Sequence, residues 1–208
     1  MKLTKLFLLI PAFMMIGCKG NTPTPSEEDK SIITEAEFTA IFQDLRLFRE
    51  ENVVMRSEIE FDGETFALTA EAENGVTKYY DEPYEENRER YIEFDDDVFT
   101  VIRYEDGNWY AKDNPMEEVN DYFFDKLAFI PFEFKDFTRD EDAKAYVAEE
   151  VIIDFDGDTN HFQDVKITFN EAKPVLVSMT FWYDDDPNQV ANFTQTFTYG
   201  NAHVVNPK

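Results

Sequence analysis

The sequence predicts an α+β protein that is mostly β, with an antiparallel sheet of about ten strands and two or three helices. Many short segments alternate apolar and polar residues, which is the two-residue period of a half-buried strand. Asp-Gly and Asn-Gly pairs follow several of these segments, as they do in tight hairpins. Only two segments carry apolar residues at helical spacing. Because each strand has one polar face, the helices are expected to cover the other face of the sheet.

One domain is expected to account for most of the chain. The 208 residues are 43% hydrophobic and 16% aromatic, which is enough for a substantial core. No internal repeat and no shift in composition indicates a second domain. We therefore predict a single globular domain over residues 34–208.

The domain is predicted to begin with one helix over residues 35–50. Thr34 and Glu37 have the spacing of a capping box, in which each residue satisfies a backbone N–H of the other. The apolar residues that follow at helical spacing are expected to dock on the core rather than to line a pocket. They are Phe38, Ile41, Phe42, Leu45 and Phe48.

A meander of about six antiparallel strands is predicted after this helix. Asp62-Gly63, Asn74-Gly75 and Asp106-Gly107 supply the turns. The predicted strands cover residues 53–61, 66–70, 76–80, 90–94, 98–104 and 109–110.

A second helix is predicted to start at Asn114, with Pro115 at its first helical position. Its apolar face is expected to consist of Val119, Tyr122, Phe123 and Leu127. An aromatic segment over residues 129–137 leads from the helix to a charged cluster at residues 139–142.

Four further strands are predicted over residues 145–155, 162–169, 175–183 and 190–199. Alternation is clearest in two of them. Their expected buried residues are Val147, Val151, Ile153 and Phe155 in one, and Val175, Val177, Met179 and Phe181 in the other.

The N-terminal segment is typical of a signal peptide over residues 1–17, with a basic start and a short apolar run. The run is too short to cross a bilayer, which takes about 20 apolar residues. It ends in Met15-Ile16-Gly17-Cys18, which resembles the lipobox of bacterial lipoproteins, although Met15 replaces the usual leucine. The alternative is an ordinary secretory peptide with a buried free cysteine.

The lipoprotein resemblance implies that Cys18 is lipidated and becomes the N-terminus after cleavage. Residues 18–33 would then be the lipidated cysteine and a polar, proline-containing tether. The expected location is the bacterial cell membrane, with the domain anchored by lipid on the extracytoplasmic side.

The order of tether, helix, meander, central helix and second meander resembles the LolA and LppX type of lipoprotein-carrier and lipid-binding folds. The resemblance implies a strongly curved, incompletely closed antiparallel sheet that wraps around the helices. It also implies a cavity for a hydrophobic or lipid ligand. The aromatic residues expected near such a cavity are Phe123, Phe124, Phe129, Phe132 and Phe134, although packing in the core is the favoured interpretation for them.

Charge and composition exclude several classes of function. The 19 basic and 45 acidic residues give a net charge of −26, which repels nucleic acids. One cysteine and two histidines leave no disulfide framework and no Cys/His zinc cluster. His161 in a predicted hairpin and His203 near the C-terminus have no obvious catalytic partner. We therefore predict no enzymatic activity and no cofactor.

Three Asp-rich segments, at residues 154–160, 95–97 and 184–187, are interpreted as solvated turns rather than calcium sites. In the first of them, Thr159 stands where an EF-hand loop has glycine and Val165 where it has its bidentate glutamate. A glycosidase carboxylate pair is also not favoured, because nothing places one carboxyl in a pocket that would raise its pKa. We predict no metal site.

Two functional hypotheses remain, with an enzyme as a distant third. The first is a lipid-anchored protein that binds a hydrophobic ligand. The second is a non-catalytic surface interaction or structural module with a filled core. In both, the domain is expected to be monomeric. A cavity of roughly 300 to 1,000 Å³ would favour the first hypothesis.

Overall fold

The computed structural model describes residues 33–155, 157–183 and 190–207. The chain divides into two units, Met1–Lys30 and Ser31–Lys208, and all described residues belong to the second. Its core cluster runs from Ile33 to Phe197, so this unit contains all of that packing. The predicted signal peptide, the lipidation at Cys18 and most of the tether lie outside the described residues.

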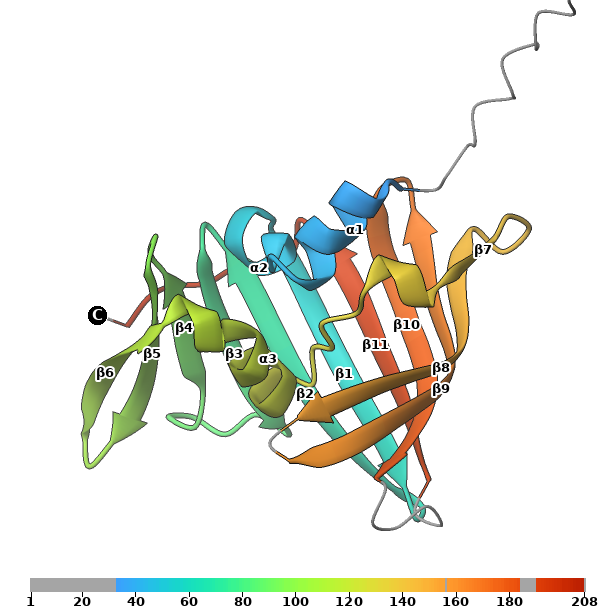
Figure 1. Ribbon diagram of the computed structural model, residues 1–208. Helices are drawn as coiled ribbons and strands as arrows, with labels where there is room; N and C mark the ends of the chain where they lie inside the picture. Colours follow the sequence, from blue (N-terminus) through green and yellow to red (C-terminus); the bar gives the residue numbers. More distant parts are fainter. Residues whose placement is uncertain (1–32, 156, 184–189, 208) are drawn as a thin grey trace, which may run out of the picture. The chain divides into compact units, whose positions relative to one another are not determined.

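Eleven antiparallel strands form one sheet, in agreement with the predicted fold class (Figure 1). The strands are β1 Val53–Phe61, β2 Glu64–Glu73, β3 Val76–Glu82, β4 Arg90–Phe94, β5 Val98–Glu105, β6 Asn108–Pro115, β7 Thr138–Asp140, β8 Ala145–Phe155, β9 Asp158–Asn170, β10 Lys173–Tyr183 and β11 Ala191–Tyr199. Their order is β6-β5-β4-β3-β2-β1-β11-β10-β9-β8-β7, so each meander keeps its sequence order. The sheet is not closed, because β6 and β7 each have a single neighbour.

The two meanders join where β1 pairs with β11. Met55 lies opposite Phe197, and both side chains are buried. On the other face of the same pair, Arg56 lies opposite Thr196. The prediction of one apolar and one polar face is confirmed in these strands.

The N-terminal segment forms two helices, α1 Glu35–Phe42 and α2 Arg46–Glu50, so the prediction of one helix over residues 35–50 is wrong. The break falls at Leu45, whose φ of 55° is left-handed. In one continuous helix, Leu47 would point away from the apolar stripe that includes Phe48. The break redirects the chain, and Leu45, Leu47 and Phe48 are all buried.

The predicted capping box at the start of α1 is confirmed. The Glu37 backbone N–H donates to Thr34 Oγ1 over 3.2 Å, and the Thr34 N–H donates to Glu37 Oε2 over 2.7 Å. The hydrogen bond from the Thr34 backbone lowers the pKa of the Glu37 carboxyl, because it stabilises the charged form.

The second predicted helix begins later than expected. Asn114 and Pro115 end β6, where Asn114 pairs with Phe99, and Pro115 has an extended ψ of 143°. A 3-10 turn, η1 Met116–Glu118, then leads into helix α3 Val119–Leu127. The predicted apolar face is confirmed: Val119, Phe123 and Leu127 are buried, and Tyr122 is partly buried against the core.

The charged cluster at residues 139–142 contains part of strand β7, which was not predicted from the sequence. β7 follows the 3-10 turn η2 Phe134–Asp136 and pairs with β8, with Arg139 opposite Tyr146. A short, charged strand at a sheet edge has no alternating pattern by which it could be recognised.

Strands β8 and β9 change their buried face part-way along. In β8, Tyr146 and Ala148 are buried and Val147 is only half-buried, whereas Val151 is buried further on. The prediction that Val147 and Val151 share one buried face is therefore wrong. The change falls at residue 149, across from Asp164 of β9, whose φ is 51°. Such irregularities bend a strand pair.

Aromatic side chains of α1, α2, α3 and the segment after α3 fill the core beside the sheet. Phe42 stacks on Phe129 with ring centroids 5.8 Å apart, and Phe48 meets Phe123 at 4.9 Å. The C-terminal end of β8 and the N-terminal end of β9 reach α3 (Figure 1). There, Phe124 contacts Phe155 and Phe162. These contacts leave α3 between the β3–β6 strands and the β8–β9 hairpin.

Candidate functional site

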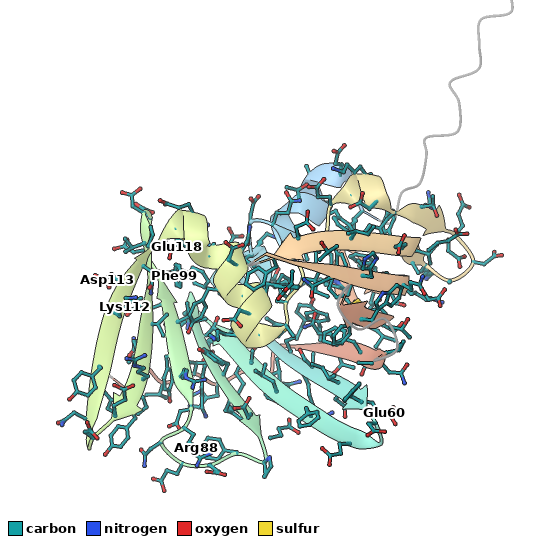
Figure 2. All side chains as sticks on the ribbon, turned by 60° about the horizontal axis from the view of Figure 1, so that its bottom comes forward. Glu60, Arg88, Phe99, Lys112, Asp113 and Glu118 are labelled. Carbon is teal, nitrogen blue, oxygen red and sulfur yellow. The ribbon has the colours of Figure 1, made fainter. Side chains whose placement is uncertain are left out.

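An apolar pocket of about 300 Å³ lies where the end of α3 meets the bent β8–β9 hairpin and strands β1, β10 and β11. Glu60, the neighbour of the lining residue Ile59, is labelled near this end of β1 in Figure 2. The apolar lining residues are Ile59, Phe124, Ala128, Ile130, Phe155, Phe162, Phe181 and Phe193.

Strand register explains why these side chains gather. Ile59 of β1 pairs with Phe193 of β11, and Phe181 of β10 pairs with Phe162 of β9. Directly paired residues point to the same face and are close enough for their side chains to touch. The Phe162 and Phe181 rings lie 6.0 Å apart. The pairings therefore build a continuous apolar wall from β1 to β9.

Two buried polar residues fix the end of α3 over this wall. Gln195 Nε2 donates to Ser57 Oγ over 2.9 Å and to the Ala128 carbonyl over 3.3 Å. Ser57 Oγ in turn donates to the Leu127 carbonyl over 3.5 Å. The last carbonyls of a helix have no partner within the helix, so these bonds satisfy groups that burial would otherwise leave unpaired. They hold Ala128 at the pocket.

Three polar residues complete the described lining: Asp125, Asp158 and Asn160. Asn160 is buried and donates through Nδ2 to the Ile153 carbonyl over 3.2 Å. The Asp125 carboxylate pairs with Lys126 at 2.5 Å. Most of the described lining is apolar, an arrangement that suits the burial of an apolar group.

The five phenylalanines named from the sequence lie in different places. Phe124 lines the pocket, with its ring 4.8 Å from that of Phe155. Phe123, Phe129 and Phe132 are fully buried in the aromatic core. Phe134 is partly buried and packs edge-on against Phe38 at 5.5 Å. One of the five therefore contacts the pocket.

Sequence reasoning did not single out Ile59, Phe155, Phe162, Phe181 and Phe193 as pocket residues. All of them lie in strands that were predicted. What could not be predicted was which strands lie side by side. β1 and β11 are neighbours although about 140 residues separate paired positions such as Ser57 and Gln195.

Of the other groups weighed from the sequence, Asp158 and Asn160 of the Asp-rich segment 154–160 line the pocket, whereas Asp154, His161 and His203 do not. His161 stacks on Trp182 at 5.1 Å and lies 3.1 Å from a Glu150 oxygen, while His203 is exposed. Asp154 accepts a hydrogen bond from Thr159 across the β8–β9 connection. Asp156 and residues 184–187 lie outside the described residues. Among the residues that the structure describes, no group of three or more His, Cys, Asp or Glu side chains is placed to hold a metal ion.

No protein-family model and no curated protein matches this chain. Within the described ranges, no helix is both long and apolar enough to span a membrane. The fold and the pocket therefore define the chain only as an open antiparallel sheet with an apolar cavity beside its central helix.

Proposed function

We propose that this chain is a membrane-anchored extracytoplasmic lipoprotein that binds a hydrophobic or lipid ligand in the pocket beside α3. The observation that carries the proposal is the pocket itself, with phenylalanines from α3, β8, β9, β10 and β11 around about 300 Å³. That volume is at the small end of the range for ligand sites, so it suits one short apolar group.

The proposed fold is a strongly curved, incompletely closed half-barrel of the LolA and LppX type. Support comes from register shifts between β9 and β10 and from the change of buried face in β8 and β9. Irregularities of this kind bend strands and increase their twist. The contact of Phe124 with Phe155 is what a sheet wrapped around a helix would produce.

The proposed anchor is a lipid on Cys18, which the lipobox-like sequence before it supports. Two or three acyl chains give stable attachment to a bilayer. The proposed location is therefore the extracytoplasmic face of a bacterial cell membrane, with the pocket carried by the domain beyond the tether.

Binding of neutral 1-alkanols tests the pocket, because these probes carry no charge. Each buried methylene contributes about 0.8 kcal/mol, so affinity should rise with chain length and level off when the pocket is full. Calorimetry on residues 19–208 measures this. An affinity that does not depend on chain length would contradict the proposal.

A pocket-filling variant and its matched control localise the binding. Ile59→Trp adds bulk inside the pocket, whereas Val54→Trp adds the same side chain to β1 five residues away, on the opposite face. We expect Ile59→Trp to lose alkanol binding and Val54→Trp to keep it. Equal binding by the two variants would exclude this pocket.

The alternative function, a non-catalytic interaction module, is favoured by the dense aromatic core around α1. Phe38 alone has four aromatic neighbours within 5.9 Å, namely Phe42, Phe134, Phe137 and Tyr146. This part of the interior is filled by the protein's own side chains. If no apolar probe binds, the non-catalytic interaction module becomes the favoured function.

A further inference from the structure

A second cavity, of about 520 Å³, lies between α3 and strands β3 to β6, and its lining is rich in cations. Arg90, Arg103, Lys112 and Lys126 all line it, together with one carboxylate, Glu105. Acidic residues outnumber basic ones by 45 to 19 in the whole chain, so this excess of positive charge is the reverse of the overall composition. Lys112 is labelled on β6 in Figure 2.

Register places two of these cations side by side. Arg90 of β4 pairs directly with Arg103 of β5, and Arg103 pairs with Tyr110 of β6. Like charges directly opposite each other on neighbouring strands destabilise a sheet. A bound anion between the two guanidinium groups would convert this repulsion into attraction.

The cations are only partly neutralised by the protein. Arg103 pairs with Glu105 at 2.9 Å, and Lys126 pairs with Asp125. Arg90 lies over the Tyr79 ring at 5.9 Å. In the described part of the chain, no carboxylate lies within 4.0 Å of the Arg90 or Lys112 side-chain nitrogens. The cavity therefore holds positive charge that is available to a ligand.

Two phenols add neutral hydrogen-bonding groups to the cavity. Tyr79 Oη and Tyr122 Oη lie 2.6 Å apart, and both residues line the cavity. Burial raises the pKa of both hydroxyls, so neither brings a negative charge near the cations at neutral pH.

We propose that this cavity binds a phosphoryl group, held mainly by Arg90 and Arg103, with Lys112 and Lys126 adding positive charge. Guanidinium groups offer planar pairs of donors that match phosphate oxygens, and they stay charged in proteins. The acidic remainder of the chain repels extended polyanions such as nucleic acids. The ligand is therefore a small phosphorylated molecule or the headgroup of a phospholipid.

Protection of a sheet edge is a simpler explanation for part of this charge. β6 is an edge strand, and inward-pointing lysines such as Lys112 discourage edge-to-edge association. Edge protection does not account for Arg90, which lies on β4, two strands in from the edge. The phosphate-binding test therefore uses variants of the paired arginines, Arg90 and Arg103.

Titration of residues 19–208 with inorganic phosphate, followed by calorimetry and by NMR of the arginine Nε–H signals, tests the proposal. We expect saturable binding with shifts at Arg90 and Arg103. Arg90→Gln and Arg103→Gln should each weaken binding at least about tenfold, since charge-assisted hydrogen bonds are strong. Lys166→Gln on β9 removes one positive charge outside the cavity and should leave binding unchanged.

Several results would overturn the proposal. One is the absence of both saturable phosphate binding and vesicle binding. Another is a phosphate affinity that is unchanged in both arginine variants. A third is an affinity for acetate equal to that for phosphate. Thermal unfolding guards against misfolded variants. Each arginine variant removes one positive charge from a chain of net charge −26, as Lys166→Gln does, so the three variants are compared without phosphate. Because a like-charge contact is gone, each arginine variant should unfold at or above the temperature of Lys166→Gln. A lower temperature in both would contradict the repulsion between Arg90 and Arg103.

Vesicles distinguish the two sources of the phosphoryl group. Sedimentation with phosphatidylcholine vesicles that contain phosphatidic acid, reversed by inorganic phosphate and lost in Arg103→Gln, supports a lipid headgroup. Phosphate binding without vesicle binding supports a soluble phosphorylated molecule. The Ile59→Trp variant should still bind phosphate, so the binding proposals for the two cavities can be tested separately.

Discussion

Gln195 and Ser57 are buried polar residues in the middle of the sheet's apolar face. Gln195→Leu would remove the donor to Ser57 and to the Ala128 carbonyl, leaving buried groups unpaired. We expect this variant to lower the free energy of unfolding by about 1–3 kcal/mol. Urea unfolding measures it, and Gln163→Leu at an exposed site on β9 is the control. Equal stabilities of the two variants would contradict the role of Gln195.

Glu82 carries a pH-dependent contribution to stability. Arg56 Nε and Nη2 donate to its carboxylate at 3.0 and 2.9 Å, and Thr69 Oγ1 donates at 2.6 Å. The hydrogen bonds from Arg56, and then that from Thr69, lower the pKa of Glu82 in the folded protein. Because the folded pKa lies below the unfolded one, the stabilisation is present above the unfolded pKa and is lost as pH falls through the folded pKa.

Glu82→Gln should therefore destabilise the protein at neutral pH and have little effect in acid. We expect a loss of about 1 kcal/mol at neutral pH, since the pair is partly exposed to solvent. Urea unfolding of wild type and variant across the acidic range measures the difference. A stability difference between wild type and Glu82→Gln that grows as pH falls would contradict this role of Glu82.

The bend in the β8–β9 hairpin brings Phe155 and Phe162 to α3. Asp164 is exposed and takes a left-handed φ of 51° at this bend. A β-branched residue fits that conformation poorly, at a cost of about 1–2 kcal/mol, whereas glycine adopts it readily. We expect Asp164→Val to destabilise the protein and to weaken alkanol binding, while Asp164→Gly retains both properties.

Two measurements check this prediction: urea unfolding and alkanol calorimetry. Gln163→Val, one residue earlier in β9, is the matched control for the change to valine. If Asp164→Val is as stable as Gln163→Val, the left-handed conformation does not constrain the hairpin, and the bend needs another cause.

Local pattern predicted most elements but not their breaks. The bounds of β8 and β4 and the capping box at Thr34 were predicted correctly, because alternation and capping depend on neighbouring residues. The break at Leu45 was not predicted, because Leu45 fits the apolar spacing of one continuous helix. Only the burial of Leu47, which lies off that apolar stripe, requires the chain to change direction. Pro115 suited a helix start equally well as a strand end.

In the described unit as a whole, the pairing of β1 with β11 decides where the pocket lies. Ile59 and Phe193 become neighbours only through this pairing, and no local pattern encodes it. The strands that carry the pocket could therefore be predicted, but their meeting point could not. The same holds for the pairing of Arg90 with Arg103, which depends on the register of β4 and β5.

Net charge should govern stability through self-repulsion. With 45 acidic and 19 basic residues, the folded state concentrates negative charge that the unfolded chain spreads out. Added sodium chloride screens this repulsion, so we expect the thermal unfolding midpoint to rise with ionic strength from a low-salt buffer. Scanning calorimetry measures the trend. A midpoint that falls on addition of salt would show that attractive ion pairs dominate instead.

Native mass spectrometry, which detects a bound molecule by its mass, can show whether the pocket beside α3 holds a hydrophobic ligand. Residues 19–208 would be purified without detergent and examined before and after incubation with a bacterial lipid extract. We predict a non-covalent adduct of lipid mass that organic extraction releases and that Ile59→Trp abolishes. A clean unliganded mass under both conditions, in wild type and in Val54→Trp, would contradict the claim and favour the interaction module.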